Sequence, residues 1–443
     1  MAKKTFPGGA HPPERKELTE RHEIVVLPPP SRVVIPLLQH TGAAAKPIVE
    51  KGQEVLVGQV LGEPTGYVSV PCHASISGKV VAIEPMPHPF GRLVESVIID
   101  SDGQDNWVEG IGEENSTDNL SPDEIRNRIR DGGLAGMGGA AFPTHVKLNP
   151  PKEKHIDTAI LNGAECEPFL TSDHRMMLEN TEDIIRGFQL IIRVLGAKRG
   201  LIGIEDNKPD AAKKIAEALK GNSDIKVFIL HVKYPQGAEK QLIWALTKRQ
   251  VPSGGLPMDV GCVVQNIGTA KAIWDAVARR KPLIDRVVTV TGPGVRQPGN
   301  FLARIGAPYS QLIDAAGGMV NGSKVIMGGP MMGLAQPSLD LPVIKGTSGI
   351  LVLDHASSKI PDPKPCILCC RCVDVCPMRL VPTRIATFVE YSILKQAESL
   401  GVFDCMECGS CTYVCPSNRN LVHWIKFGKL GILDARKKAK ETA

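Results

Sequence analysis

The sequence predicts a multidomain protein that combines α/β and β architecture. A chain of 443 residues is too long for one hydrophobic core and suggests three or four domains. Short apolar runs separated by turns dominate two segments, and longer helical patterns alternate with apolar runs between them. Near the C-terminus, eight cysteines recur in two evenly spaced groups. These observations predict an N-terminal β domain, an α/β domain, a second β domain and a small α-helical, cysteine-rich domain.

The first 30 residues are rich in proline and glycine and end in Pro28-Pro29-Pro30. This composition predicts an irregular N-terminal arm, residues 1–30, with an extended exit. Residues 31–105 follow as a β domain, because short apolar runs alternate there with turn residues. The expected strands cover residues 32–37, 55–60, 68–70, 78–83 and 94–99.

Within this β domain, residues 49–83 resemble a lipoyl-like barrel-sandwich domain. One half reads V-x-x-G-Q-x-V-x-x-G-Q-x-L from Val49 to Leu61, and the other half runs from Val70 to Val80. The hairpin that would carry a lipoylated or biotinylated lysine, residues 63–67, contains no lysine. We therefore expect a structural or docking domain rather than a swinging arm.

Residues 120–280 are predicted to form an α/β domain. Ser121-Pro122-Asp123-Glu124 places an N-cap residue, a proline and two acids at the start of a helix. The short apolar runs suit the strands of a buried parallel sheet. The expected helices cover residues 122–131, 180–195, 209–219, 238–246 and 269–279, and the expected strands cover residues 158–161, 199–204, 226–231 and 262–265.

The rest of the chain is expected to form a second β domain, a cysteine-rich domain and a tail. The β domain covers residues 281–353, and the cysteine-rich domain covers residues 361–425, with one helix over residues 383–400. Residues 426–443 are predicted to be a basic, weakly amphipathic helical tail, either solvated or docked on an acidic partner or anionic membrane. In the β domain, strands are expected at residues 287–291, 324–327 and 350–353, and a helix at residues 309–315.

Two cysteine runs carry the strongest chemical signal in the chain. Each reads C-x2-C-x2-C-x3-C-P, the spacing of bacterial two-cluster ferredoxins, in which thiolates ligate two 4Fe-4S clusters. The fourth cysteine of such a run usually ligates the other cluster. Structural zinc is the alternative, but two complete copies of the run favour iron–sulfur clusters. Cys370, an extra cysteine inside the first run, is not expected to be a ligand. The expected ligand sets are Cys366, Cys369, Cys372 and Cys415 for one cluster, and Cys405, Cys408, Cys411 and Cys376 for the other.

Composition argues against several classes of protein. The net charge of +5, with no basic stripe interleaved with aromatic residues, argues against nucleic-acid binding. We find no secretory signal, and no run approaches the roughly 18 apolar residues needed to cross a bilayer. We therefore expect a soluble or peripheral protein in the reduced cytoplasm, which suits its cysteines.

A glycine-rich segment, residues 132–147, is the second chemical signal. Its glycines let backbone N–H groups close on a phosphate, and Lys147 supplies a compact counter-charge. It matches neither a dinucleotide-binding fingerprint nor a Walker loop, and a flexible surface loop is the alternative. Residues 162–168, Asn-Gly-Ala-Glu-Cys-Glu-Pro, then follow an apolar strand at its carboxyl end, where ligand groups are typical.

Together these segments resemble the flavin- and NADH-binding subunit of respiratory complex I. That family carries G-L-R-G-R-G-G-A-G-F-P-T-G-x-K, then N-A-D-E-S-E-P, G-E-E and an N-N pair. This chain departs from the family at both arginines (Ala135, Met137), at the aspartate (Ala164) and at the first glutamate of G-E-E (Ala238). The resemblance implies a Rossmann-like domain that binds FMN non-covalently and takes NAD(H) as substrate.

Carried over position by position, the resemblance gives a set of site residues and no catalytic nucleophile. It implies that the set surrounds the flavin and its nicotinamide partner. Gly136, Gly138, Gly139 and Lys147 would line the FMN phosphate and isoalloxazine, Asn162 and Glu165 would hydrogen-bond the flavin, Phe142 and Glu167 would face the nicotinamide, and Glu239, Gln265 and Asn266 would complete the site.

The whole order of segments is similar to the RnfC family, the flavin and iron–sulfur subunits of Rnf-type ferredoxin:NAD+ oxidoreductases. The similarity begins with Phe6-Pro7-Gly8-Gly9-Ala10-His11-Pro12-Pro13-Glu14 and extends to the cysteine runs. It implies that residues 281–353 form a β-grasp (SLBB) domain. It also implies electron transfer between ferredoxin-derived iron–sulfur centres and NAD+ through two 4Fe-4S clusters and FMN.

The same resemblance predicts partners and a location. We expect the other subunits of an Rnf complex, including a ferredoxin-like iron–sulfur subunit and membrane subunits that translocate Na+ or H+, with ferredoxin contributing indirectly. The chain would be peripheral, at the cytoplasmic face of the cell membrane. Two alternatives stay open: a cobalamin-reductase-type flavoprotein of a microcompartment, and an electron-relay subunit with a vestigial NAD site.

Overall fold

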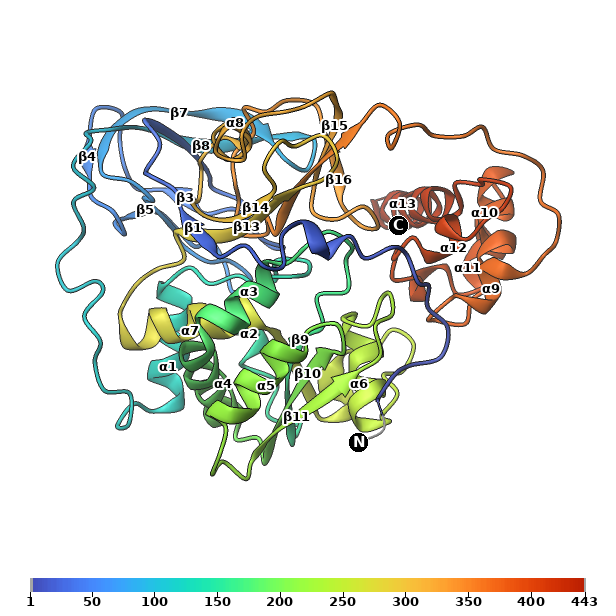
Figure 1. The fold of residues 1–443 in the computed structure, drawn as a ribbon, viewed down its shortest axis with the longest axis horizontal. Coiled ribbons are helices and arrows are strands. Elements are labelled where there is room, and N and C mark those ends of the chain that lie inside the picture. The colour runs from blue at the N-terminus through green and yellow to red at the C-terminus, as the bar shows by residue number, and fades with distance from the viewer. Residues whose placement is uncertain (1–2, 442–443) are drawn as a thin grey trace.

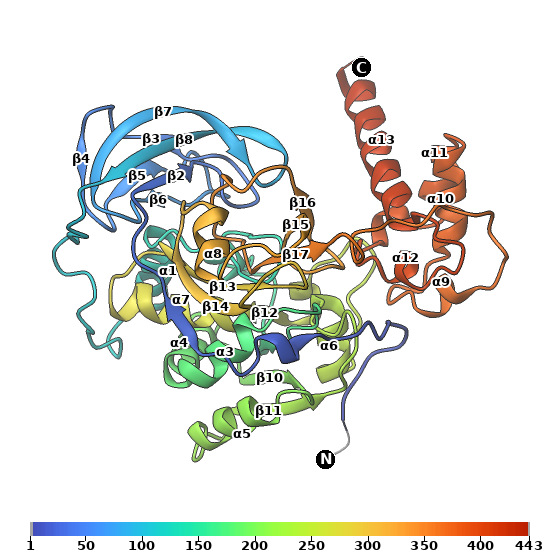
Figure 2. The same ribbon diagram turned by 45° about the horizontal axis from the view of Figure 1, so that its top comes forward.

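The computed structural model describes residues 3–441 and has four units. The two β domains lie together against the α/β domain, and the cysteine-rich domain lies to one side (Figure 1). A long irregular segment after β17 (Gly349–Asp354) leads to the cysteine-rich domain. The N-terminal arm begins beside the α/β domain, passes the cysteine-rich domain and ends in β1 (Ile24–Val26) within the second β domain (Figures 1 and 2).

The N-terminal β domain has two antiparallel sheets, with strand orders β2-β8-β7-β4 and β3-β5-β6. Paired residues of β2 and β8, such as Val33 with Ile99, are buried in its core. Two expectations were wrong. No described strand covers residues 68–70, and the strand expected over residues 55–60 is divided by a turn at Gly58. The strands are β2 (Arg32–Pro36), β3 (Lys46–Pro47), β4 (Glu54–Val55), β5 (Val60–Glu63), β6 (Cys72–His73), β7 (Gly78–His88) and β8 (Arg92–Ser101).

The α/β domain is built on a four-stranded parallel sheet of order β11-β10-β9-β12, as its apolar runs predicted. The predicted N-cap of α1 is present, because Ser121 and Glu124 form a capping box. The sequence analysis missed α3, which directly precedes α4. The elements are α1 (Pro122–Asp131), α2 (Thr144–Lys147), β9 (Thr158–Gly163), α3 (Ser172–Glu179), α4 (Thr181–Leu195), β10 (Arg199–Glu205), α5 (Pro209–Ala218), β11 (Ile225–Leu230), α6 (Glu239–Thr247), β12 (Cys262–Asn266) and α7 (Ile267–Ala278).

The second β domain is a six-stranded mixed sheet of order β1-β14-β13-β17-β15-β16. Its edge strand β1 corrects the prediction that residues 1–30 are an irregular arm, because Ile24–Val26 pairs in parallel with β14. Composition could not reveal this strand, since its partner lies far along the chain. Apart from β1 and β17, the elements are β13 (Asp285–Thr291), β14 (Gly299–Arg304), α8 (Tyr309–Ala315), β15 (Gly322–Met327) and β16 (Leu334–Gln336).

The cysteine-rich domain contains short helices and one long one, and it corrects two further expectations. The single helix expected over residues 383–400 is broken at Ser392, whose φ of 60° ends the first helical piece. The basic tail is not separate, because its helix begins at Leu421 and buries Ile425 and Ile432 in the core of this domain. The helices are α9 (Arg371–Asp374), α10 (Pro382–Glu390), α11 (Leu394–Ser399), α12 (Ser410–Tyr413) and α13 (Leu421–Glu441).

None of the helices within residues 3–441 combines the length and apolar character that crossing a membrane requires. The buried apolar residues of the α/β domain lie between its helices and its sheet. Two of these helices, α4 and α7, also pack directly against each other. A Cβ atom at Gly187 of α4 would stand 1.8 Å from the carbonyl oxygen of Ala270 in α7. Glycine at this position therefore allows two buried helices to approach closely.

We predict that Gly187→Ala destabilises the α/β domain, because α4 and α7 must separate to admit one methyl group. The cost should be about 2 kcal/mol or more, which exceeds the roughly 1 kcal/mol that alanine gains over glycine in a helix. Thermal unfolding monitored by circular dichroism measures this change. Gly66→Ala is the control, since a Cβ at Gly66 meets nothing within 4 Å. Equal melting temperatures for the two variants would contradict the tight packing.

Candidate functional site

The glycine-rich segment forms a closed loop between α1 and α2. The N–H of Gly136 donates to the carbonyl of Phe142 (2.8 Å), and the N–H of Met137 donates to Thr269 Oγ1 (2.9 Å). Gly138 has a φ of 79°, and a Cβ there would lie 2.8 Å from Asn266 Nδ2. A side chain at this position would therefore enter the space beside Asn266, whereas the tip at Gly139 is exposed.

The predicted amides lie at the carboxyl edge of the parallel sheet, at the ends of the neighbouring strands β9 and β12. Asn162 donates to the carbonyl of Gly237 (2.8 Å) and accepts the N–H of Ala164 (3.1 Å). Asn266 caps α7 and donates to Asp173 (2.6 Å). Gln265 is buried, and its Nε2 has no hydrogen-bond partner in the described structure. The edge thus offers one buried donor that the protein leaves free.

Two charged residues predicted for the site already interact with each other. Lys147 Nζ lies 2.6 Å from Glu239 Oε1, and both side chains are partly exposed. This ion pair joins α2, which directly follows the glycine loop, to the first turn of α6. Phe142 is half-buried in the same loop. The structure therefore brings the glycines, Lys147, Glu239 and the amides into one region of the α/β domain.

The segment between β9 and α3, residues 164–170, carries two predicted site acids, and we call it the acid loop. The Glu165 carboxylate accepts the N–H groups of Asp173 (2.7 Å) and His174 (3.1 Å) at the start of α3. The Glu167 carboxylate accepts the N–H groups of Met331 (3.2 Å) and Met332 (2.8 Å) in the second β domain. Backbone N–H groups thus hold both carboxylates, and their roles toward flavin and nicotinamide stay predictions.

Burial shifts the titration of Glu167. Desolvation raises its pKa to about 7, against the smaller lowering effects of the Met331 and Met332 N–H groups and of Lys16. Desolvation also raises the pKa of Asp173 to about 7, with the Glu165 charge as the next cause. Burial therefore favours the protonated form of both acids.

These groups fit a bound FMN. A glycine stands where a side chain would fill the space beside Asn266, Lys147 offers a cation for a phosphate, and the buried Gln265 amide keeps an unused donor. Sequence analysis missed Thr269, which anchors the glycine loop from α7. No local motif marks this threonine, because its contact with the glycine loop forms only when α7 packs against that loop in the folded protein.

One set of cysteines surrounds a cavity inside the cysteine-rich domain. Cys376, from the first run, lines it together with Cys405, Cys408 and Cys411 of the second run. Burial raises the pKa of the Cys411 thiol, and the neighbouring Cys405, Cys408 and Cys376 raise it further. Apolar side chains such as Leu380 and Ile425 complete the lining. We call these four cysteines the inner cysteines.

The other four predicted ligands, Cys366, Cys369, Cys372 and Cys415, are the outer cysteines. Cys366 and Cys369 are exposed. Burial raises the pKa of the Cys372 thiol, and the proximity of Cys415 and Cys366 adds to this rise. Within residues 3–441, no three His, Cys, Asp or Glu side chains form a group that could hold a single metal ion. Cys376 thus lies with Cys405, Cys408 and Cys411, and the ligand sets of the two clusters stay predictions.

The two cysteine runs also share a backbone conformation. Left-handed residues recur at matching positions, with Leu368 and Cys370 in the first run and Glu407 and Gly409 in the second. This conformation turns backbone N–H groups onto sulfur, as in the 3.4 Å contact from Leu368 to Cys366 Sγ and the 3.4 Å contact from Glu407 to Cys405 Sγ. Hydrogen bonds of this kind are typical around iron–sulfur clusters. Cys370 therefore occupies a turn position that the second run fills with glycine.

The inner cysteines lie next to the α/β domain. Tyr234 Oη donates to the carbonyl of Cys408 (2.8 Å), and Gln241 Nε2 donates to the carbonyl of Pro377 (3.2 Å). Tyr234 also precedes Gly237 and Glu239 of the candidate flavin site by a few residues. One short segment thus contacts both the cysteine cavity and the flavin side of the sheet. The sequence analysis missed Tyr234, which belongs to no motif that it quoted.

Family models match along most of the chain. The RnfC barrel sandwich hybrid domain matches residues 4–104, and the Nuo51 FMN-binding domain matches residues 129–275. The SLBB domain matches residues 287–335, and the 4Fe-4S dicluster domain matches residues 358–416. The predicted multidomain architecture is confirmed in this order.

Two relatives match over nearly their whole lengths. The C subunit of the Na(+)-translocating ferredoxin:NAD(+) oxidoreductase complex of Acetobacterium woodii is 47% identical, over 98% of this chain and 98% of its own. The C subunit of the proton-translocating ferredoxin:NAD(+) oxidoreductase complex of Clostridium ljungdahlii is 47% identical, over 96% of this chain and 93% of its own. This chain belongs to the RnfC family. As an RnfC chain, it is the C subunit of an ion-translocating ferredoxin:NAD+ oxidoreductase complex, as predicted.

More distant similarity extends to other members and to solved structures. The C subunit of the ion-translocating oxidoreductase complex of Rhodobacter capsulatus is 40% identical to this RnfC chain, over 98% of the chain and 84% of its own length. An NAD+-reducing NiFe hydrogenase in the H2-reduced state matches with a TM-score of 0.49 and 21% identity. That match covers 69% of this chain and 59% of the hydrogenase chain.

The raised pKa of Glu167 predicts a pH-dependent stability of this RnfC chain. Between its unfolded value near 4.3 and about 7, folded Glu167 keeps a proton that the unfolded chain releases, so stability falls as pH rises. Glu167→Gln removes this pH-dependent loss because an amide does not titrate, although its single oxygen can accept from only one of the Met331 and Met332 N–H groups. Relative to wild type, the variant should gain about 1–3 kcal/mol between pH 5 and pH 8, measured by thermal unfolding. A difference independent of pH would show that Glu167 is ionised throughout.

Proposed function

We propose that this chain binds FMN non-covalently and two 4Fe-4S clusters, and that it passes electrons between ferredoxin-derived iron–sulfur centres and NAD+. FMN, when bound, supplies chemistry that joins one-electron carriers to the two-electron hydride of nicotinamide. The observation that carries the proposal is the Tyr234 contact, which joins the inner cysteines to the segment leading into Glu239. Membership of the RnfC family supports the same assignment.

The residues of the α/β domain would bind and orient the flavin. The backbone of Gly136, Gly138 and Gly139 would close on the phosphate and isoalloxazine, with Lys147 as the counter-charge. Lys147 would keep or exchange its contact with Glu239 as the flavin enters. The free donor of Gln265 supports its assignment as a flavin contact. Asn162, Glu165, Gln265 and Asn266 would hydrogen-bond the flavin, and Phe142 and Glu167 would lie on the nicotinamide side.

The cysteines would hold the clusters crosswise. The inner set, Cys376 with Cys405, Cys408 and Cys411, lines one cavity and adjoins the α/β domain, which supports its assignment to the cluster nearer the flavin. The outer set, Cys366, Cys369, Cys372 and Cys415, includes two exposed cysteines, Cys366 and Cys369, where a partner's iron–sulfur centre could approach. Ile367 and Leu368 are exposed apolar residues within this outer loop. They would form part of the docking surface for a ferredoxin-like subunit.

Partners and location follow from the family. The chain would be peripheral at the cytoplasmic face of the membrane, beside membrane subunits that translocate Na+ or H+. Two relatives of equal identity are named for different ions, Na+ in Acetobacterium woodii and protons in Clostridium ljungdahlii. The choice of ion would therefore rest with the partner subunits rather than with this chain.

A second candidate is an electron relay with a vestigial NAD site. It is favoured by the ion pair of Lys147 with Glu239 and by the backbone contacts that already occupy Glu165 and Glu167. Flavin stoichiometry and an NADH titration of the purified chain distinguish the two candidates. Under the main proposal the chain carries about one FMN that NADH bleaches, whereas a relay would show no NADH-dependent change.

We predict that anaerobically purified protein contains about eight irons and eight acid-labile sulfides. Cys408→Ser should lose one cluster selectively, and Cys370→Ser should keep both, because Cys370 lies in neither thiol set. Iron and sulfide analysis together with electron paramagnetic resonance measures both outcomes. Stoichiometric zinc with little sulfide would overturn the cluster assignment.

Gly138→Val and Lys147→Ala should both lose most of the FMN that acid precipitation releases from wild type. Valine would place its side chain against Asn266, and alanine would remove the phosphate's counter-charge. Gly66→Val is the matched control, because a Cβ at Gly66 meets nothing within 4 Å. Full FMN content in the Gly138 variant would show that the cradle lies elsewhere.

Glu167→Gln should slow flavin reduction by NADH by about tenfold or more while most FMN is retained, because Glu167 is assigned to the nicotinamide side. Stopped-flow absorbance measures the rate.

The association of this chain with the membrane is tested by fractionating cell extracts with and without the membrane subunits. The chain should sediment with membranes only when those subunits are present. Recovery outside the membrane fraction in both cases, with undiminished ferredoxin-dependent NAD+ reduction, would refute the peripheral-subunit proposal.

A further inference from the structure

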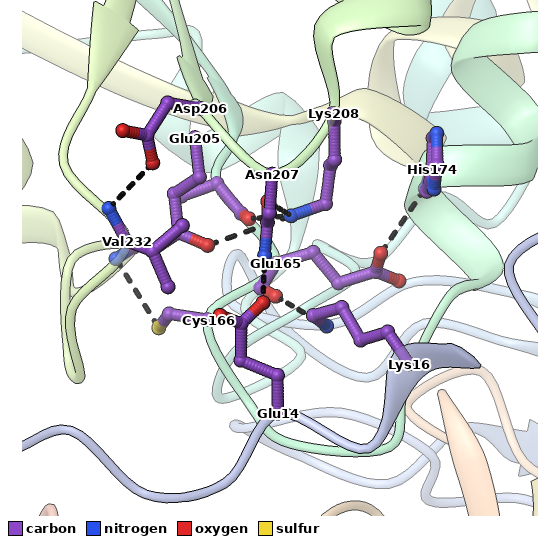
Figure 3. Close-up of polar contacts among 12 residues, drawn as sticks. Glu14, Lys16, Glu165, Cys166, His174, Glu205, Asp206, Asn207, Lys208 and Val232 are labelled. Atoms are coloured by element: carbon purple, nitrogen blue, oxygen red, sulfur yellow. Dashed lines mark hydrogen bonds and ion pairs between the residues drawn. The ribbon is translucent and has the colours of Figure 1, made fainter. Parts of the chain in front are cut away.

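A lysine of the N-terminal arm lies buried against the acid loop. Lys16, in a single helical turn η1 (Lys16–Leu18), is 4% exposed. Its ammonium group donates to the carbonyls of Glu165 (2.8 Å), Glu167 (3.0 Å) and Leu170 (2.5 Å). An ammonium has three donors, and all three are directed to one segment far away in the sequence. Figure 3 shows Lys16 reaching this segment from the arm.

The acid loop has a shape that needs such a partner. Glu165 and Phe169 have φ values of 47° and 70°, a left-handed conformation that costs a residue with a side chain about 1 kcal/mol or more. Within the same loop, the carbonyls of Glu165, Glu167 and Leu170 converge on the Lys16 ammonium group. The N–H of Phe169 in turn donates to the carbonyl of Glu14 (2.7 Å), two residues before Lys16. The arm therefore satisfies the inward carbonyls and also one N–H of the loop.

With its backbone held inside, the loop presents its side chains outward to three different elements. Glu165 reaches the start of α3, and Glu167 reaches Met331 and Met332. Cys166 Sγ accepts the N–H of Gly237 (3.3 Å), next to the candidate flavin site. The position of Lys16 thereby fixes the position of Glu167 without any direct contact between Lys16 and a reacting group.

The charge of Lys16 also acts on neighbouring acids. Burial lowers the pKa of Lys16, and Lys208 lowers it further, while Glu165 and Glu205 oppose this. In return, the Lys16 charge lowers the pKa of Glu167 and of Glu205, both of which burial raises to about 7. The other titratable groups that interact with Glu167 are Cys166 and Tyr234. Removing Lys16 therefore takes away the cation that offsets the burial of Glu167.

We propose that Lys16 is a positioning residue for hydride transfer between NAD(H) and the flavin: its ammonium group holds the acid loop so that Glu167 faces the nicotinamide side. The inference rests on the proposed function and extends it to the N-terminal arm. A mere stabilising contact would lower the melting temperature without changing the reaction of the folded protein. A positioning role instead changes the rate and the pH dependence of flavin reduction by NADH in the folded protein.

The test compares Lys16→Met with Lys3→Met in the full-length chain loaded with clusters and FMN. Methionine keeps much of the length of lysine but has no donors and no charge. Lys3 belongs to the same arm but forms a half-exposed ion pair with Asp206 at the surface (2.5 Å). Each variant is checked for iron, sulfide and FMN content, so that rates are expressed per flavin. Stopped-flow reduction by NADH is then followed from pH 5.5 to pH 9.

We expect Lys16→Met to retain both clusters, because the inner and outer cysteines belong to a separate core, and to reduce its flavin at least about tenfold more slowly. Its pH profile should shift upward by about half a unit to one unit, since the cation that favours ionised Glu167 is gone. Lys3→Met should match wild type in rate and pH profile. Lys16→Gln, which keeps two donors without the charge, should recover part of the rate but keep the shifted profile.

If Lys16→Met does not accumulate as folded protein, the double variant Lys16→Met/Glu205→Gln takes its place. The second change removes the buried Glu205 carboxylate, which loses the nearby Lys16 charge in the single variant. The same slow, shifted reduction is expected from it. A wild-type rate and pH profile in either Lys16 variant, while NADH reduces the wild-type flavin, refutes the inference alone. A wild-type chain whose flavin NADH does not reduce refutes the proposed function, and this inference with it.

Discussion

The acid loop follows β9 at the carboxyl edge of the parallel sheet. Its path directs four carbonyl groups into the protein, where each needs a hydrogen-bond donor. Lys16 supplies three of these donors, and Lys208 supplies the fourth, at 2.8 Å from the carbonyl of Ala164. A buried carbonyl without a partner costs about 1–3 kcal/mol. Four such losses would rival the total stability of a typical domain, roughly 5–15 kcal/mol. The path of the loop, and with it one wall of the candidate flavin site, therefore depends on two ammonium groups.

The two lysines are tolerable inside the protein only because acids accompany them. Glu205, at the end of β10, is 1% exposed, and its Oε2 lies 3.4 Å from Lys208 Nζ. Glu14 reaches the same group of side chains through Asn207 (2.5 Å), as Figure 3 shows. Removing one partner of such a buried set leaves an uncompensated charge, which is more costly than losing a surface pair. The arm, the acid loop and the loop after β10 thus require one another, although they are distant in the sequence.

Local signals in the sequence predicted the features that depend on near neighbours. The N-cap of α1, for example, needs only Ser121 and Glu124. The crosswise ligand sets rest on the spacing of the cysteine runs alone and stay a prediction. The glycine loop and the strand-end amides were found as motifs, although Glu165 and Glu167 proved to be held by backbone groups.

Several features that sequence analysis missed depend on residues far apart in the chain. Strand β1 exists because β14 offers an edge, and nothing in its own Pro-rich surroundings indicates it. Lys16 and Tyr234 look like ordinary arm and loop residues until the fold buries them. The tail was assigned as separate because its basic residues suggested a solvated surface, whereas Gly428 allows α13 to lie against Val389 of α10. In each case tertiary contact overrode the local composition.

The arm also sets how the cysteine-rich domain meets the flavin domain. Gly9 donates to the carbonyl of Val375 (2.8 Å), and Ala10 exchanges two backbone hydrogen bonds with Tyr234, whose hydroxyl contacts Cys408. A Cβ at Gly8, where φ is 81°, would stand 2.8 Å from the carbonyl oxygen of Cys376. A side chain there must push the inner cysteines away from Tyr234, although both domains could remain intact. Backbone contacts of the arm therefore fix the position of the inner cysteines relative to Tyr234 and the segment that leads from it into α6.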